Sequence, residues 1–77
     1  MVKAMIILSK EEKSSKVRKL EKDVIEIIQE FGVVPKGGSA TELSFMVDMS
    51  KEDLKKAEEG IKYYSDKAGF DIEVILE

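Results

Sequence analysis

The stretch VVPKGGSATELSFMVDMS, residues 33–50, decides how many strands the sheet of this protein contains. Its second half alternates apolar and polar side chains, which is the pattern of a half-buried strand over residues 42–49. Its first half holds the only proline of the chain and its only Gly-Gly pair. Because glycines supply the positive backbone dihedrals that tight turns need, residues 36–39 are expected to form a hairpin turn after a short strand at 33–34.

A phosphate-binding loop is the alternative interpretation of the same glycines. Such a loop directs several backbone N–H groups at an anion and is generally followed at once by a helix. Here the glycines lead into a strand, and the Walker spacing of glycine, four residues and Gly-Lys-Ser/Thr is absent. We therefore expect a turn, with Pro35 at a sheet edge, where its missing N–H group is tolerated.

Two further strands and two helices are predicted by periodicity. Residues 2–8 and 70–76 alternate like residues 42–49, and the first run is also rich in β-branched side chains. Elsewhere apolar residues recur every three or four positions, which predicts two amphipathic helices. The apolar stripe of the first comprises Val17, Leu20, Val24, Ile27, Ile28 and Phe31, and that of the second comprises Leu54, Ala57, Ile61, Tyr64 and Ala68.

The start of the first helix has two interpretations. Ser9 and Glu12 have the spacing of a capping box, in which each side chain binds a backbone N–H group of the other residue. Alternatively, Ser14 or Ser15 is the cap, and the residues before it form a lysine-rich loop. Gly32 stands where a left-handed helix stop is expected.

The second helix has clearer ends. Ser50 is expected to cap it, with Asp53 three residues later at the positive end of the helix dipole. Gly69 is expected to end it. Gly60 interrupts this helix beside Ala57, and the two small residues are expected to let the first helix approach closely.

The element order βαββαβ, in one domain covering residues 1–77, resembles the ferredoxin-like fold. This is an α+β two-layer sandwich, with two helices on one face of an antiparallel sheet. If residues 33–34 do not pair, the alternative is a three-stranded βαβαβ arrangement. Both alternatives use right-handed crossovers.

Composition excludes several chemistries and sets the expected location. The chain has no cysteine and no histidine, so disulfides, thiolate nucleophiles and the commonest metal ligands and general bases are missing. We expect no metal site and no cofactor. No apolar run has the length of a secretory signal or membrane span, so a cytoplasmic protein without membrane contact is expected. Twelve lysines and no asparagine or tryptophan resemble thermophile composition, and a designed chain would look similar.

The resemblance to the ferredoxin-like fold implies no known chemistry. Acylphosphatases of this fold rely on an asparagine and on an arginine before the first helix, whereas this chain has no asparagine and its only arginine, Arg18, lies within the predicted helix. Phosphocarrier proteins need a histidine. RNA-recognition domains stack bases on aromatic side chains of the two central strands, and the corresponding face here has none. With no predicted pair of buried carboxylates, we expect no catalytic residues and no enzyme.

The sheet face that the two helices leave uncovered provides the leading functional hypothesis. Period-two alternation places four apolar side chains on it, Met5, Ile7, Met46 and Ile75, edged by Lys3, Glu42, Asp48 and Glu73. A contiguous apolar patch on a small protein generally marks an interface, and methionines adapt to a partner's shape. We therefore expect a non-enzymatic interaction or regulatory module that forms a homodimer or binds a partner protein.

A second hypothesis places an anion site at the basic start of the first helix. Lys13, Ser14, Ser15, Lys16, Arg18 and Lys19 would combine cations, hydroxyls and free N–H groups there, suiting nucleic acid or a phosphate ligand. Neighbouring acidic residues dilute this charge, and a solvated helical face is the favoured interpretation. A third alternative is a designed or engineered scaffold with no natural function.

Overall fold

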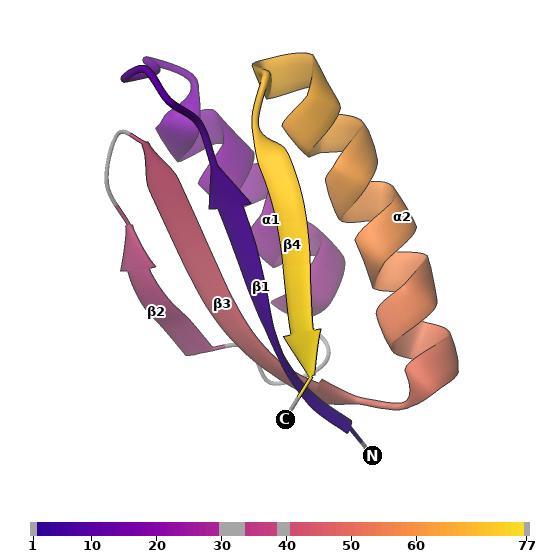
Figure 1. Ribbon diagram of the computed structural model, residues 1–77. Coiled ribbons are helices and arrows are strands. Elements are labelled where there is room, and N and C mark those ends of the chain that lie inside the picture. The colour runs from indigo at the N-terminus through magenta and orange to yellow at the C-terminus, as the bar shows by residue number, and fades with distance from the viewer. Residues whose placement is uncertain (1, 30–33, 39–40, 77) are drawn as a thin grey trace.

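The computed structural model describes residues 2–29, 34–38 and 41–76 (Figure 1). Along the chain the elements follow the order βαββαβ. They are β1 (Val2–Ser9), α1 (Val17–Ile28), β2 (Val34–Gly38), β3 (Glu42–Met49), α2 (Lys51–Ala68) and β4 (Asp71–Leu76). Both ends of the chain lie at the same end of the sheet (Figure 1).

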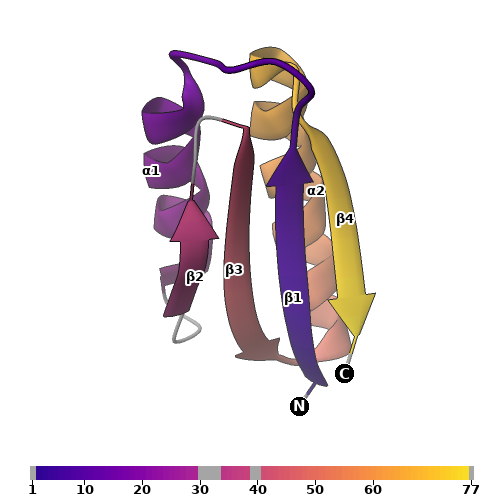
Figure 2. The same ribbon diagram turned by 60° about the vertical axis from the view of Figure 1, so that its left-hand side comes forward.

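The strands form one antiparallel sheet in the order β2-β3-β1-β4, so the first strand lies inside the sheet. The view in Figure 2 shows α1 and α2 together behind this sheet, which makes the molecule a two-layer structure. Long regular ladders join β1 to β3 and β1 to β4. In one row across the sheet, Met5 lies between Met46 on β3 and Ile75 on β4.

The predicted path of the chain before β3 is wrong, and the predicted fold is corrected accordingly. The glycines expected to form a turn belong to β2 itself: Gly37 pairs with Ser44 and Gly38 with Leu43. The ladder shifts register between Pro35 and Gly37. An edge strand tolerates a proline because one side of its backbone has no strand to bind. The sheet therefore differs from the predicted ferredoxin-like one: only β3, β1 and β4 are joined by regular ladders, and β2 is a short, irregular edge strand. Residues 33 and 39, which the prediction placed in the strand and the turn, lie outside the described residues.

The hydrophobic core lies between the sheet and the helices. Along β1, Ala4, Ile6 and Leu8 are fully buried at 0% exposure. The other buried core residues are Leu20, Val24, Ile28, Leu43, Phe45, Val47, Met49, Leu54, Ala57, Ile61 and Phe70. The inward-facing side chains of the strands and the apolar stripes of the helices therefore pack together in one core, as their periodicities predict.

Both predicted ends of α2 are confirmed. The Ser50 hydroxyl accepts a hydrogen bond from the backbone N–H of Asp53 at 3.2 Å. At the other end, Gly69 has φ 78°, a left-handed conformation that favours glycine, and its N–H group donates to the Asp66 carbonyl at 3.1 Å.

The capping box predicted for the first helix is wrong. Ser9 belongs to β1, where it lies opposite Glu42 and Asp71, so its backbone is part of the sheet. Helix α1 starts at Val17 and has no side-chain cap. Residues 10–16 connect β1 to α1, so the loop of the alternative is present, but neither Ser14 nor Ser15 is the cap: the residue before the helix is Lys16. The predicted stop at Gly32 lies outside the described residues, and α1 ends at Ile28.

The helices approach each other where Gly60 was expected to permit it. A Cβ atom added to Gly60 would lie 3.4 Å from Cδ1 of Ile27 on α1. Gly60 therefore faces the first helix, as predicted, although a methyl group at this position would still make an ordinary contact with Ile27.

Candidate interaction surface and inter-helix pocket

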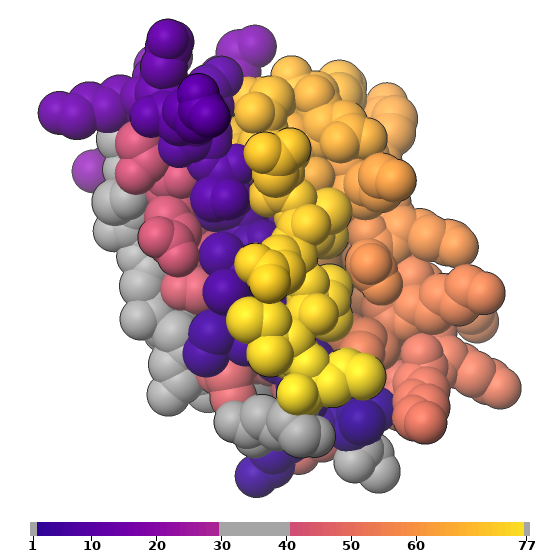
Figure 3. Space-filling model, in the orientation of Figure 1, coloured from indigo at the N-terminus to yellow at the C-terminus, as the bar shows by residue number. Residues whose placement is uncertain are grey.

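The outer face of the sheet is the face that the helices leave open (Figure 2). Figure 3 looks onto this face, where the atoms of β3, β1 and β4 lie side by side at the surface. Successive side chains of a strand point to opposite faces of the sheet, so each residue on this face has neighbours in the chain that are directed toward the helices. This face therefore carries the side chains that the core does not use.

Four apolar side chains form a contiguous group on this face, which we call the sheet-face patch: Met5, Ile7, Met46 and Ile75. Met5 on the central strand is directly opposite both Met46 and Ile75. Side chains directly opposite each other on antiparallel strands have Cβ atoms about 4.5–5.5 Å apart, so this row has no gap. Ile7 follows on the same face of β1. The structure thus brings together all four residues that the sequence singled out.

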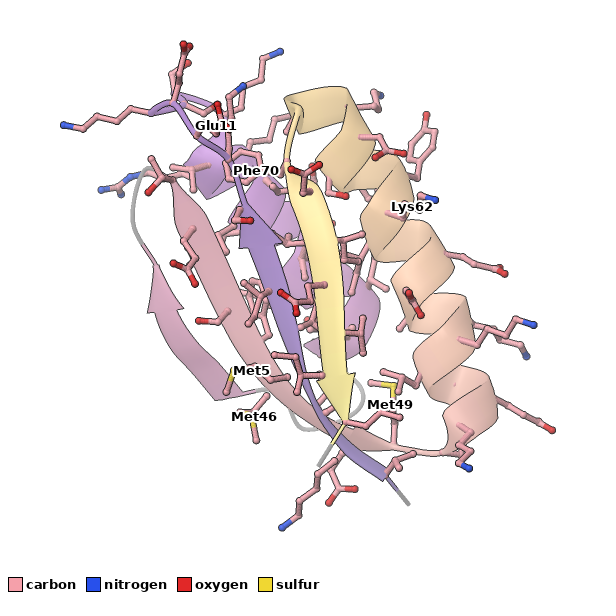
Figure 4. The ribbon with its side chains drawn as sticks, in the orientation of Figure 1. Met5, Glu11, Met46, Met49, Lys62 and Phe70 are labelled. Atoms are coloured by element: carbon pink, nitrogen blue, oxygen red, sulfur yellow. The ribbon has the colours of Figure 1, made fainter. Side chains whose placement is uncertain are left out.

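Exposure separates this patch from the core. Ile75 is 44% exposed, and the other three patch residues are half-buried. Met49, by contrast, is 1% exposed. Figure 4 shows Met5 and Met46 close together, with Met49 between β4 and α2. The methionines of the described chain therefore occupy two different environments, one accessible and one enclosed.

The charged residues around the patch are mostly acidic. Lys3 lies opposite Asp48 at one end of the β1–β3 ladder. On the β4 side, Glu73 lies opposite Ile7, and Asp71 lies opposite Ser9. Glu42 on β3 lies opposite Ser9 on β1. The described rim therefore has one ammonium group, that of Lys3, and four carboxylates, those of Glu42, Asp48, Asp71 and Glu73.

Leu76 is a residue whose position the alternation did not predict. Its phase in β4 places it with Ile72 and Val74, which pack against the core. Leu76 is nevertheless 57% exposed. A strand pattern indicates which face a residue is on, but only the tertiary structure shows where the covering helices end.

The basic residues predicted to bind an anion are divided between a loop and a helix. Lys13, Ser14, Ser15 and Lys16 precede the helix, whereas Arg18 and Lys19 are in its first turn. The Ser14 hydroxyl accepts a hydrogen bond from the Lys16 N–H group at 3.1 Å, so it helps to shape the loop. The first turn of α1 contains no acidic residue.

Two of these six residues line a pocket between the ends of the two helices. The pocket has a volume of about 230 Å³. Its lining residues are Lys16, Lys19, Leu20, Asp23, Tyr64, Lys67 and Ala68. The three from α2 were not part of the predicted site, because only the packing of α1 against α2 brings them there.

The cations of this pocket are partly held by neighbours. Lys19 Nζ lies 3.3 Å from an Asp23 carboxylate oxygen, and the lysine side chain is 79% exposed. Lys67 Nζ lies 5.1 Å from the centre of the Tyr63 ring, a cation–π distance. The pocket therefore combines three ammonium groups with one carboxylate and an apolar wall from Leu20 and Ala68.

Within the described residues, no group of three or more metal-ligating side chains is placed to hold a metal ion. The helices of the described ranges include none long and apolar enough to span a membrane. Comparison with protein-family models and with curated proteins finds no match for the chain.

Proposed function

We propose that this protein is a non-enzymatic interaction module whose sheet-face patch binds another protein surface, either a second copy of the chain or a different protein. The observation that carries the proposal is the unbroken row of Met46, Met5 and Ile75 across three strands, on the face opposite the helices. A cytoplasmic location belongs to the same proposal.

Burial of this row would be favourable for a physical reason. Removing apolar surface from water contributes roughly 25 cal/mol per Å². Methionine side chains are flexible and polarizable, so Met5 and Met46 can follow the shape of a partner. Since a small domain has little core to stabilise it, contact with a partner would also add to its stability.

The distribution of polar groups supports a binding role over catalysis. Among the described residues, Ser65 is the only polar residue that is buried, and its hydroxyl donates to the Lys62 carbonyl at 3.1 Å. The described carboxylates all remain in contact with solvent. Buried, positioned carboxylates are typical of general acid–base sites, and the described carboxylates are not of this kind.

A matched pair of variants tests the proposal. Met46→Asp places a charge in the patch, whereas Tyr63→Asp changes a residue on α2 that is 60% exposed. Light scattering after size-exclusion chromatography measures self-association, and affinity capture from a native lysate measures partner binding. Circular dichroism checks that both variants remain folded.

We expect Met46→Asp to lose the association or the captured partner, and Tyr63→Asp to retain it. If both variants and the original chain are monomers and capture the same proteins in equal amounts, the proposal is wrong. A loss in both variants would equally contradict it, because the effect would then not belong to the patch.

The inter-helix pocket supports a second candidate function, the binding of a phosphate-bearing ligand or nucleic acid. The favouring observation is that α2 contributes Lys67 to the same pocket as Lys16 and Lys19. NMR titration at low salt with inorganic phosphate, nucleotides and oligonucleotides tests it. Binding should weaken steeply with added salt and in Lys67→Gln, but not in Lys55→Gln, an exposed α2 residue that does not line the pocket. If no resonance shifts, this function is withdrawn.

A further inference from the structure

The charges around the sheet-face patch limit the kinds of surface that can cover it. Among the outward-facing residues of β1, β3 and β4, Lys3 is the one cation. It lies directly opposite Asp48, so the positive charge is matched within its own row. Lys3 therefore adds little net positive charge to this face.

The edge formed by β4 contributes two of the four carboxylates of the rim, and neither lies opposite a charged residue of β1. Glu73 and Asp71 point to the same side of the strand as Ile75, because residues two apart in a strand share a face. They lie opposite Ile7 and Ser9 on β1, neither of which is charged. Both carboxylates are exposed, so they are available to a partner.

A second copy of the chain would be a poor match for this rim. In a two-fold symmetric contact, the same surface meets itself. The carboxylates of one copy would then face β1, β3 and β4 of the other, whose outward-facing residues include a single ammonium group, Lys3, already opposite Asp48. Like charges brought together across an interface disfavour the complex, whereas opposite charges favour it and guide the encounter.

We infer, on the basis of the proposed function, that the surface that binds the sheet-face patch is a segment of a different protein with an apolar stripe flanked by lysine or arginine. The stripe covers Met46, Met5 and Ile75. The flanking cations pair with Glu73 and Asp71. The apolar row supplies most of the affinity, and the rim selects the partner by charge.

Two synthetic helical peptides test this inference with one measurement. Both have the same leucine stripe, but one is flanked by lysines and the other by glutamates. Binding to the full chain is followed by NMR of methionine methyl groups labelled with carbon-13. Met5 and Met46 report on the patch, and Met49, at 1% exposure, is the internal reference.

We expect the lysine peptide to shift Met5 and Met46 while Met49 stays in place. The glutamate peptide should bind at least about tenfold more weakly at low salt, since rim charges act through attraction and repulsion that salt screens. Added salt should reduce the difference between the two peptides.

Charge-reversed variants separate the rim from the net charge of the protein. In Asp71→Lys/Glu73→Lys the preference should move toward the glutamate peptide. Glu52→Lys/Glu59→Lys makes the same change in net charge on exposed positions of α2 and should keep the original preference. Circular dichroism confirms the fold of both.

Each outcome has a defined meaning. Equal binding of the two peptides, a preference for glutamate, or a stable dimer of the unmodified chain at low salt would overturn the inference and leave the proposed function standing. Shifts that avoid Met5 and Met46 would overturn it too. If neither peptide binds and the chain neither dimerises nor captures a partner, the proposed function fails with it.

Discussion

The two faces of the sheet come from the same strands but differ in burial: the helices cover one face and leave the other open. Along β1, Ile6 is 0% exposed beneath the helices, whereas the next residue, Ile7, is half-buried on the open face. The side chains are chemically identical, so the difference lies only in what covers them. The comparison shows that an apolar residue in a strand belongs to the core only where a helix covers its face of the sheet. The patch is therefore apolar surface that lies outside the core between the sheet and the helices.

The largest expected effect is a difference in stability between these two isoleucines. Ile6→Ala should lower the free energy of unfolding by about 3–4 kcal/mol, because it removes buried methylene groups and leaves a cavity in the core. Ile7→Ala should cost about 1 kcal/mol, since its site remains partly in contact with water. Urea denaturation followed by circular dichroism measures both. Equal losses would mean that the two faces are equally buried, and the open patch would not exist in solution.

The methionines provide a chemical test of the same contrast. Oxidation by dilute hydrogen peroxide depends on access to the sulfur atom. We therefore expect Met5 and Met46 to become sulfoxides well before Met49, which the core encloses. Peptide mass spectrometry over a time course measures the order. Oxidation of Met49 at the same rate as Met46 would contradict the described orientation of β3.

The smallest expected effect concerns the layer that covers the inner face. Gly60→Ala should raise the free energy of unfolding by about 0.5–1 kcal/mol, because alanine favours a helix interior more than glycine does. The added methyl group would meet Ile27 at 3.4 Å, an ordinary contact distance. Thermal unfolding measures the change.

Gly69→Ala is the control of opposite sign for this prediction. At φ 78° a side chain is strained, so this variant should lose about 1–2 kcal/mol. A destabilised Gly60→Ala would show that the helices lie closer together than described.

Sequence reasoning succeeded where the deciding interactions are local. Ser50 and Gly69 end α2 as predicted, because capping depends on residues within one turn of the helix. Alternation also placed Met5, Met46 and Ile75 on one face. It failed at the start of α1, where Ser9 fits a capping box by spacing but is held by strand pairing on both sides.

The dependence on contacts between distant segments also explains why the turn before β3 was misplaced and why the predicted basic site lacked its α2 residues. Residues 37–38 have the local preferences of a turn, yet pairing with Ser44 and Leu43 holds them in β2. Lys67 could not be assigned to the basic cluster by spacing, because α2 reaches Lys16 and Lys19 only after the helices pack. Prediction from local sequence fails where a segment distant in the chain supplies the hydrogen-bond partners or the neighbouring side chains.

By itself the amino-acid sequence determined the periods of the strands and helices, the ends of α2, the missing cysteine and histidine chemistry, and the sharing of apolar side chains between two faces of a sheet. Only the tertiary structure decided the row Met46–Met5–Ile75, its acidic edge on β4, and the exposure of Leu76. The physical reason is that periodicity arises from backbone geometry within a segment. Register, coverage and the surroundings of a charge depend on segments that meet only when the chain has folded.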